Sequence, residues 1–384
     1  MTRPRLIFVL AGEPSGDVLG GRLMTALKAA SGGGVKFIGV GGPAMRAQGL
    51  DSLFPMEELS VMGIVEILPH VRRLFARMRQ TAAAVDAAQP DCVVTIDAPA
   101  FAHGVAKRIR NRAIPRIHYV APQLWAWRPW RVHKFKRHFH HLLGLLPFEP
   151  AWFARHGVSC KFVGHPAIEN ATTAPESNGF RQRHGIALDA PVVCVLLGSR
   201  KGEVARLEAP FRDTLARLKL AHPGLVAVLP TVPNVAVSVR ALSADWPVRA
   251  IMVEAAADKP AALAACDVGL AASGTVTLEL SLAGVPLIVA YRVAALTYLI
   301  ARPLMRVRFA NLINLILDRE AVPEFLQENC RVDCLAPALS SLFGPDGVRQ
   351  REAVQPALKQ LGMGGRPPSE RAANAVLDII AGRA

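Results

Sequence analysis

Ser273-Gly274-Thr275-Val276-Thr277-Leu278-Glu279 lies at a junction that sets the architecture of this chain. It follows an apolar run, 267–272, that predicts a strand, and it opens a helix expected over 276–283. Small residues at such a turn let a ligand approach the backbone, and the N–H groups at a helix start favour phosphate. Glu279 follows within the helix, where its carboxylate suits a ribose diol. The pattern fits a nucleotide diphosphate site or a capped core helix; the spacing from Thr275 to Glu279 exceeds a capping box and slightly favours the first.

Short β-rich runs alternate with helical patterns on both sides of this stretch. Such alternation is typical of parallel sheets covered by helices on both faces. Two sets of runs indicate an α/β chain with two Rossmann-like domains. The expected strands are 5–11, 36–40, 91–96, 116–120 and 142–146, followed by 192–197, 225–229, 250–253, 267–271 and 287–290.

The length of 384 residues also favours two domains. Polar and small residues over 164–179 indicate a linker. We therefore expect an N-terminal domain at 1–168 and a C-terminal domain at 169–347. The segment 348–384, with a last helix starting near Pro367, is expected to complete the N-terminal domain.

The composition predicts a cytoplasmic chain. The six cysteines are scattered through apolar segments as reduced core residues, and Cys330 and Cys334 lack the further ligands of a zinc site. The apolar run after Arg5 is too short for a secretory signal. The most apolar window, 268–291, fits a helix followed by a strand better than a membrane span.

The formal net charge of +15 is unevenly distributed. Residues 98–148 contain no Asp or Glu but ten Lys or Arg and six His. Residues 69–79 predict an amphipathic helix with Val71, Leu74, Phe75 and Met78 on one face and arginines on the other. Such a helix suits an anionic membrane surface. A solvated basic face is the alternative, and nucleic acid is disfavoured because its motifs are absent and aromatic content is only 6%.

Four expected strand ends carry residues suited to a ligand site, because open α/β sheets bind ligands beyond the carboxyl ends of their strands. Residues 12–17 lack the dinucleotide fingerprint, which argues against NAD. Asp97 ends a buried strand and fits either a general base or a structural cap. Residues 197–203 combine a glycine turn with two cations that suit a diphosphate. With the Ser-Gly-Thr turn, each half contributes two such sites, which we expect to face one interdomain cleft.

These motifs together resemble the lipid-A-disaccharide synthase family. The resemblance runs in order through nearly the whole chain. It covers Ala11–Asp17, Gly39–Gly42, Val61–Pro69, Ile96–Pro99, Tyr119–Arg128, Pro147–Glu149, Phe162–Pro166, Leu197–Arg200, Ser273–Glu279, Tyr291–Arg292 and Val322–Glu324.

The resemblance implies a GT-B fold and an inverting glycosyl transfer that needs neither a metal nor a cofactor. The implied donor is UDP-2,3-diacylglucosamine, and the acceptor is 2,3-diacylglucosamine 1-phosphate, called lipid X. The products are lipid A disaccharide 1-phosphate and UDP, made by a peripheral enzyme on the inner face of the cytoplasmic membrane. The oligomeric state is left open.

The resemblance also implies site residues. Asp97 and Glu13 are expected to be catalytic. The residues expected to bind the UDP-sugar are Ser199, Arg200, Glu203, Ser273, Gly274, Thr275, Thr277, Glu279 and Asn314. Those expected around the acceptor are Ser15, Asp17, Met62, Gln123, Trp125 and Arg128. The chain departs from the family pattern at Ala100, where a second acid is expected, at Leu197, where a proline is expected, and around Asn311–Asn314.

Other interpretations stay open at this point. His165 suits a hinge or core position better than catalysis, and the tryptophans near Arg128 fit core packing or acceptor and membrane contact. Another UDP-sugar GT-B transferase, such as the peptidoglycan-lipid type, is the nearest rival, but its Gly-Gly-Thr-Gly-Gly-His loop is absent after Leu10. A UDP-GlcNAc epimerase is a weaker rival. A basic module without catalysis is the alternative from another class, and UDP binding would distinguish it.

Overall fold

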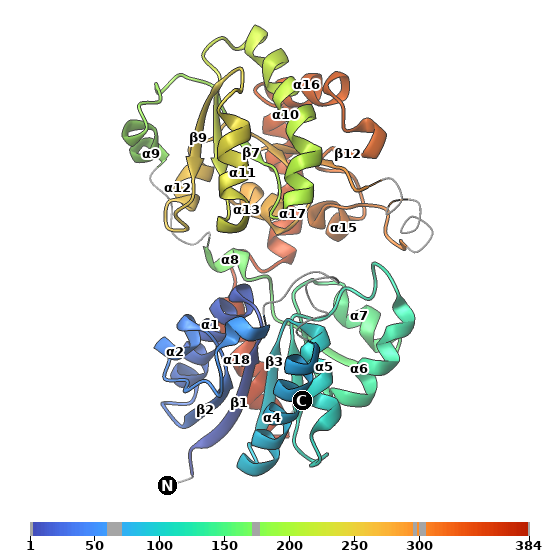
Figure 1. Cartoon of the computed structure of the whole chain (residues 1–384). Coiled ribbons are helices and arrows are strands. Elements are labelled where there is room, and N and C mark those ends of the chain that lie inside the picture. Colours follow the sequence, from blue (N-terminus) through green and yellow to red (C-terminus); the bar gives the residue numbers. More distant parts are fainter. Residues whose placement is uncertain (1–2, 60–70, 171–176, 295–297, 299–304, 383–384) are drawn as a thin grey trace. The chain divides into compact units, whose positions relative to one another are not determined.

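The computed structural model describes residues 3–59, 71–170, 177–294, 298 and 305–382. The chain forms two compact units, Met1–Pro166 with Gly364–Ala384, and Ala167–Met363. Each unit contains a six-stranded sheet whose neighbouring strands run parallel (Figure 1). The predicted α/β architecture with two Rossmann-like halves is confirmed.

Unit 1 is a parallel sheet with helices on both faces. Its strands are β1 (Arg5–Ala11), β2 (Val35–Val40), β3 (Cys92–Ile96), β4 (Arg116–Tyr119), β5 (His141–Gly144) and β6 (Ser159–Phe162). Its helices are α1 (Pro14–Ala30), α2 (Pro43–Ala47), α4 (Val71–Ala88), α5 (Pro99–Arg108), α6 (Val132–His138), α7 (Glu149–Ala154) and α18 (Pro368–Ile380), with 3-10 turns η1 (Met56–Leu59) and η3 (Pro129–Arg131). The strand order is β2-β1-β3-β4-β5-β6.

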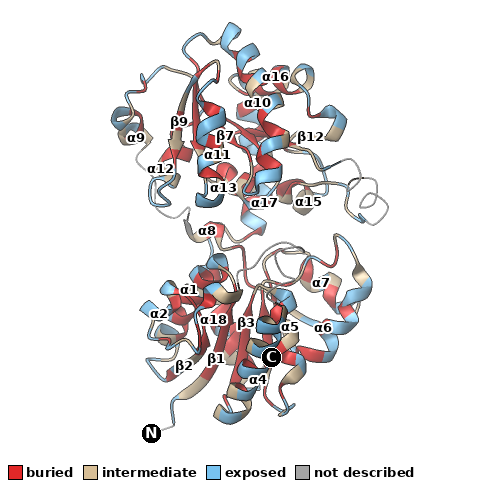
Figure 2. Ribbon diagram, in the orientation of Figure 1, coloured by how far each residue is buried: buried red, intermediate tan, exposed pale blue. Residues whose placement is uncertain are grey.

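The central strands β1 and β3 of unit 1 are mostly apolar on both faces, because both faces are buried. In β1, Ile7 and Val9 pack with α1 and α18, whereas Phe8 and Leu10 pack with α4, α5 and α7. Figure 2 shows β3 and most of β1 as buried. The helix nearest the C-terminus thus completes the core around the first strand.

Unit 2 repeats this architecture. Its strands are β7 (Val192–Leu196), β8 (Val226–Pro230), β9 (Arg249–Val253), β10 (Val268–Ala271), β11 (Leu287–Tyr291) and β12 (Glu324–Leu326), in the order β12-β11-β10-β7-β8-β9. Its helices are α8 (Ala167–Asn170), α9 (Ser177–Arg183), α10 (Lys201–Ala221), α11 (Pro233–Ser243), α12 (Lys259–Ala264), α13 (Thr275–Leu282), α15 (Leu312–Leu317), α16 (Val332–Ser341) and α17 (Pro345–Gln360), with the 3-10 turn η5 (Gln327–Asn329).

Two strands and one domain boundary differ from the expectation. β6 and β12 were not predicted, because β6 is an edge strand that alternates exposed with half-buried residues and β12 has only three residues. Residues 348–363, expected in the N-terminal domain, belong to unit 2. Most of them form α17, where the Gln350 side chain accepts the Leu287 N–H at 2.6 Å and donates to its carbonyl at 3.0 Å.

Candidate active site

The carboxyl ends of β1 and β3 meet where the strand order of unit 1 reverses. β2 lies on one side of β1 and β3 on the other, and Ala11 pairs with Ile96. Gly12 and Asp97 therefore leave neighbouring strand ends, which is where open α/β sheets bind ligands. A Cβ atom at Gly12 would lie 2.8 Å from Ala98 Cβ, so the close approach requires glycine.

Asp97 is half-buried at this position and has an unusual backbone. Its φ is 51° and that of Ala98 is 44°, so two consecutive non-glycine residues are left-handed. Such conformations cost on the order of 1–3 kcal/mol each and concentrate at functional sites. Burial raises the pKa of Asp97, although the Ala98 N–H, which donates to Oδ1 at 2.9 Å, works against the shift. A carboxylate with a raised pKa is suited to general-base work.

The turn after β1 places its three polar residues differently. Glu13 is half-buried at the N-cap of α1, and Ser15 is exposed. Asp17 is buried, and its carboxylate accepts backbone N–H groups of Gly42 at 2.7 Å, Ala44 at 2.8 Å and Met45 at 3.1 Å. Asp17 therefore holds the start of α2 and has a structural role.

The aromatic segment of unit 1 separates into buried and exposed parts. Trp125 is buried, donates from Nε1 to Glu149 Oε1 at 3.2 Å and meets Phe148 edge-on, so it belongs to the core. Gln123 is exposed, and the Arg128 guanidinium stacks 4.2 Å from the centre of the Trp127 ring. Met62 lies outside the described residues.

In unit 2 the order reverses between β7 and β10. Ala271 pairs with Leu196, and β8 lies on the other side of β7. The loop 197–200 and the Ser-Gly-Thr turn therefore start from adjacent strand ends. All four strand-end segments singled out in the sequence lie at the two reversal points.

Glu203 organises the first of these loops in unit 2. Its buried carboxylate accepts the N–H groups of Ser199 at 3.0 Å and Arg200 at 3.3 Å, the Arg200 guanidinium at 2.8 Å and the Tyr291 hydroxyl at 3.0 Å. Ser199 and Arg200 are exposed. The geometry makes Glu203 the support of the loop and leaves Arg200 at its surface.

The Ser-Gly-Thr turn is an open helix start. Gly274 and Thr275 are exposed, and Gly274 has a φ of 156°, which side chains rarely adopt. Thr277 is buried and donates from Oγ1 to the Gly274 carbonyl at 2.8 Å, whereas Ser273 Oγ donates to the Ala310 carbonyl at 3.0 Å. These two hydrogen bonds hold the turn, while its residues Gly274 and Thr275 stay exposed at the start of α13. An exposed helix start of this kind is what phosphate binding requires.

Glu279 is half-buried in α13 and forms an ion pair with Lys259. Lys259 begins α12, a different helix, and belongs to none of the sequence motifs quoted above. Only the packing of α12 against α13 brings the two charges together.

Asn314 has a supporting role in unit 2. Its amide donates to the Val322 carbonyl at 2.7 Å and to Glu324 at 2.8 Å, and its oxygen accepts the N–H groups of Ala321 and Val322. Glu324 also accepts the Ala310 N–H at 2.7 Å, next to the carbonyl that Ser273 contacts. Asn314 and Glu324 therefore brace the Ser-Gly-Thr turn. Both belong to motifs quoted above, but their contacts depend on the fold.

Other sequence expectations can be placed directly. His165 is buried, and burial lowers its pKa to about 4, so its imidazole is neutral near pH 7. Within 3–59, 71–170, 177–294 and 305–382, no group of three or more His, Cys, Asp or Glu is arranged to hold a metal ion. None of the helices in the described part of the chain combines the length and apolar character that a bilayer-spanning helix needs.

The apolar face predicted for residues 69–79 is partly wrong. Leu74 and Met78 pack against the core of unit 1 and are not available to a membrane. Phe75 is exposed, with the Arg108 guanidinium 5.3 Å from its ring centre. Arg77 pairs with Glu58 and so is not a free cation. The helix α4 is amphipathic because its apolar face packs largely against the core of unit 1. Residues 60–70 lie outside the described part.

The fold defines the chain as a GT-B protein. The UDP-GlcNAc 2-epimerase from Neisseria meningitidis, solved bound to UDP-GlcNAc, matches with a TM-score of 0.65 at 11% identity, covering 98% of this chain and 100% of that one. The glycotransferase of kitacinnamycin matches with a TM-score of 0.65 at 17% identity over 98% and 99%. Epimerases and transferases share this fold, so the fold alone does not choose between them.

Sequence similarity makes that choice. The chain belongs to the lipid-A-disaccharide synthase family and is a glycosyltransferase of lipid A biosynthesis: the family model described as lipid-A-disaccharide synthetase matches residues 7–365. The lipid-A-disaccharide synthase of Rhodospirillum centenum is 50% identical over 385 residues, covering 99% of this chain and 96% of the relative. The resemblance inferred from the motifs is confirmed.

Proposed function

We propose that the enzyme transfers 2,3-diacylglucosamine from UDP to the 6-hydroxyl of 2,3-diacylglucosamine 1-phosphate with inversion. The O6–C1 bond forms, the bond from C1 to the UDP oxygen breaks, and its electron pair leaves with UDP. Family membership supports the reaction class. The position of the half-buried Asp97 at the reversal point of unit 1 carries the assignment of its base.

Unit 1 activates the acceptor in this proposal. Asp97 takes the O6 proton as the new bond forms, and its raised pKa favours that transfer. Glu13, which follows the neighbouring strand end, orients the acceptor, and the exposed Ser15 and Gln123 contact its sugar or phosphate together with the half-buried Arg128. Asp17 and Trp125 keep this surface in place.

Unit 2 binds the donor in this proposal. The exposed Arg200 and the start of α13 at Ser273, Gly274 and Thr275 neutralise the diphosphate, which makes UDP a better leaving group. Glu279 holds the ribose diol, with Ser199 nearby. Glu203, Thr277 and Asn314 act through the loops that they support.

Binding to an anionic membrane surface from the cytoplasmic side completes the proposal. Phe75, Trp127 and Trp130 are 48%, 45% and 57% exposed, and all belong to unit 1. Arg108 and Arg128 lie over two of these rings. Aromatic rings with adjacent cations suit the headgroup region.

Vesicle sedimentation in a salt series tests this surface with the wild type and two variants. The double variant Phe75→Ser/Trp127→Ser should bind vesicles more weakly than the wild type. Leu220→Ser, which changes an exposed apolar residue of unit 2, should bind like the wild type. Equal binding by all three proteins would rule out this surface.

The reaction is tested by UDP release from UDP-2,3-diacylglucosamine with and without the acceptor. We expect release only when both are present, unchanged by EDTA, and none from UDP-GlcNAc. Release that needs added magnesium would contradict the metal-independent mechanism. UDP binding without any transfer would favour a non-catalytic module.

A further inference from the structure

Arg116, the first residue of β4, is buried at 4% exposure. Among the residues that the structure describes, neither its Nε nor its Nη1 has a partner. Nη2 lies 3.1 Å from His140 Nε2, while the Arg116 backbone N–H donates to Nδ1 of the same ring at 3.0 Å. Burial lowers the pKa of His140, and in a neutral ring whose Nδ1 accepts, Nε2 carries the proton. Two donors then face each other, so this contact does not satisfy the guanidinium.

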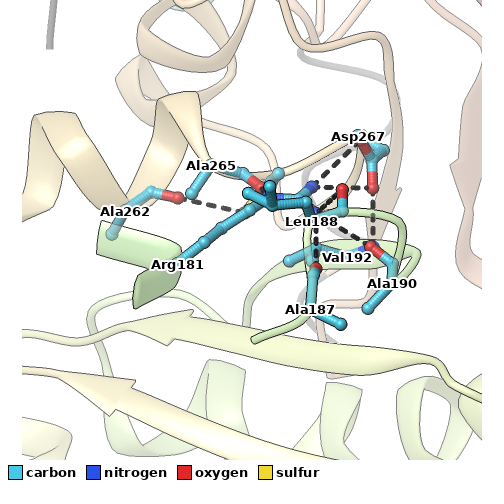
Figure 3. Close-up of polar contacts among 9 residues, drawn as sticks. Arg181, Ala187, Leu188, Ala190, Val192, Ala262, Ala265 and Asp267 are labelled. Atoms are coloured by element: carbon cyan, nitrogen blue, oxygen red, sulfur yellow. Dashed lines mark hydrogen bonds and ion pairs between the residues drawn. The ribbon is translucent and has the colours of Figure 1, made fainter. Parts of the chain in front are cut away.

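Arg181 in unit 2 shows how this protein normally treats a buried guanidinium. It is 7% exposed, and all three of its nitrogens are satisfied (Figure 3). Nε donates to the Ala265 carbonyl at 3.0 Å, and Nη2 contacts both carboxylate oxygens of Asp267 at 3.1 and 3.2 Å. Nη1 donates to the carbonyls of Ala187, Leu188 and Ala190. Arg116 has none of these partners.

The surroundings of Arg116 are positive, with Arg112 close by. The chain from 98 to 148 offers no carboxylate. Asp86 approaches this region, but its oxygens accept the N–H groups of Arg110 and Asn111. His138 is buried, and its Nδ1 has no partner in the described part of the chain. Burial chiefly lowers the pKa of His138 to about 4, and the nearby charges of Arg112 and Arg116 contribute to the shift.

An uncompensated buried charge costs several kcal/mol, and buried donors without acceptors are rare in native proteins. A phosphate group supplies oxygens and negative charge together, and a guanidinium binds it well. We infer that Arg116 anchors an anion site that takes a phosphate group, with Arg112 and the imidazole of His138 beside it. The exposed His140 side chain covers the guanidinium and can swing away to admit the ligand.

This site is separate from the candidate active site. Arg116 pairs with Val93 and Tyr119 with Ile96, so Arg116 lies at the amino end of the sheet. Asp97 follows the opposite end, about 13 Å further along the strands. The inference therefore does not depend on the proposed reaction.

The first test follows the melting temperature of the full-length protein in rising inorganic phosphate at constant ionic strength. A ligand of the folded state alone should raise Tm by about 5 °C or more at a hundredfold excess over its Kd. We expect a saturable rise in the wild type, Arg46→Met and Arg200→Ala, and a clearly smaller rise or none in Arg116→Met, which keeps only the proposed diphosphate site of unit 2. Arg46 is exposed and loses the same charge, and Arg200→Ala controls for the proposed diphosphate site of unit 2.

Vesicles of phosphatidylcholine with and without phosphatidic acid identify the source of the phosphate. Arg116-dependent sedimentation with the acidic lipid points to a headgroup, and a phosphate response without it points to a free anion. If Arg116→Met fails to fold, His140→Ala should shift the phosphate midpoint by about threefold or more, the scale of one hydrogen bond. An unchanged midpoint in that variant overturns the site. Equal responses of Arg116→Met and wild type to phosphate and to vesicles, or no response by wild type to either, also overturn it.

Discussion

Lys259 and Glu279 form an ion pair that joins the first residue of α12 to the helix behind the Ser-Gly-Thr turn. Both side chains are partly covered, at 35% and 23% exposure. Since Lys259 engages Oε2, it leaves the other carboxylate oxygen of Glu279 for the ribose diol that we propose as its ligand. Lys259 is then a positioning residue.

Lys259→Met should weaken UDP binding about threefold to tenfold by calorimetry, the scale of one ordinary hydrogen bond, because the lysine acts only through Glu279. Glu279→Ala should weaken it further, and the double variant should resemble Glu279→Ala because the lysine acts through the carboxylate. Additive losses would show that Lys259 contacts UDP itself.

Asp97→Asn should lower kcat by two or more decades, the share usually assigned to general-base catalysis. The exposed Asp51→Asn, in the same unit, is the matched control and should leave kcat unchanged. A base must be deprotonated, and the pKa of Asp97 is raised, so wild-type kcat/KM should fall with acid at a midpoint above the ordinary value of about 3.9. If Asp97→Asn keeps the decrease of kcat/KM at low pH, another group is responsible for that decrease.

Gly12→Ala should reduce turnover because its new Cβ would press on Ala98 Cβ, 2.8 Å away, and displace the left-handed turn at Asp97. Ala98→Gly removes the opposing atom and also suits the φ of 44°. The double variant should therefore recover most of the activity that Gly12→Ala loses. Activity and melting temperature are measured for the wild type, both single variants and the double variant. A double variant as inactive as Gly12→Ala would rule out the contact with Ala98 as the cause.

Glu149 should make unit 1 less stable as pH rises. Burial raises its pKa from 4.5 to about 7, against opposing hydrogen bonds from Leu146, Trp125 and Leu145. The folded state therefore holds a proton that the unfolded state has lost. The contribution is complete below pH 4.5, falls as pH rises through 7, and amounts to roughly 3 kcal/mol.

Denaturant unfolding of wild type and Glu149→Gln at pH 5 and pH 8 measures this effect. The variant cannot ionise, so it should gain stability relative to wild type at pH 8. A constant difference between the two proteins across that range would mean that Glu149 ionises normally.

The sequence alone determined the alternation of strands and helices and the four strand-end segments at the reversal points. Buried parallel strands are continuous apolar runs, and small residues mark the turns where they end. The same local signals also carried the family motifs. The sequence did not predict β6 or β12. β6 is an edge strand with alternating exposure and β12 has only three residues, so both have too little apolar pattern.

Only the tertiary structure decided which polar residues are exposed and which are supports. Asp17, Glu203 and Asn314 stand in motifs like Asp97 and Arg200, but backbone groups surround their side chains. For Asp17 these groups come from α2, some 25 residues further along the chain. The apolar stripe of α4 likewise marks a buried face, which periodicity cannot distinguish from a membrane-facing one.

The contrast between Arg116 and Arg181 has the same physical basis. Residue type and local pattern do not show whether a buried guanidinium finds acceptors, because the free energy of a buried charge depends on groups that the fold brings to it. The loop before β7 and Asp267, which directly precedes β10, supply them to Arg181. No element of unit 1 supplies them to Arg116 among the residues that the structure describes.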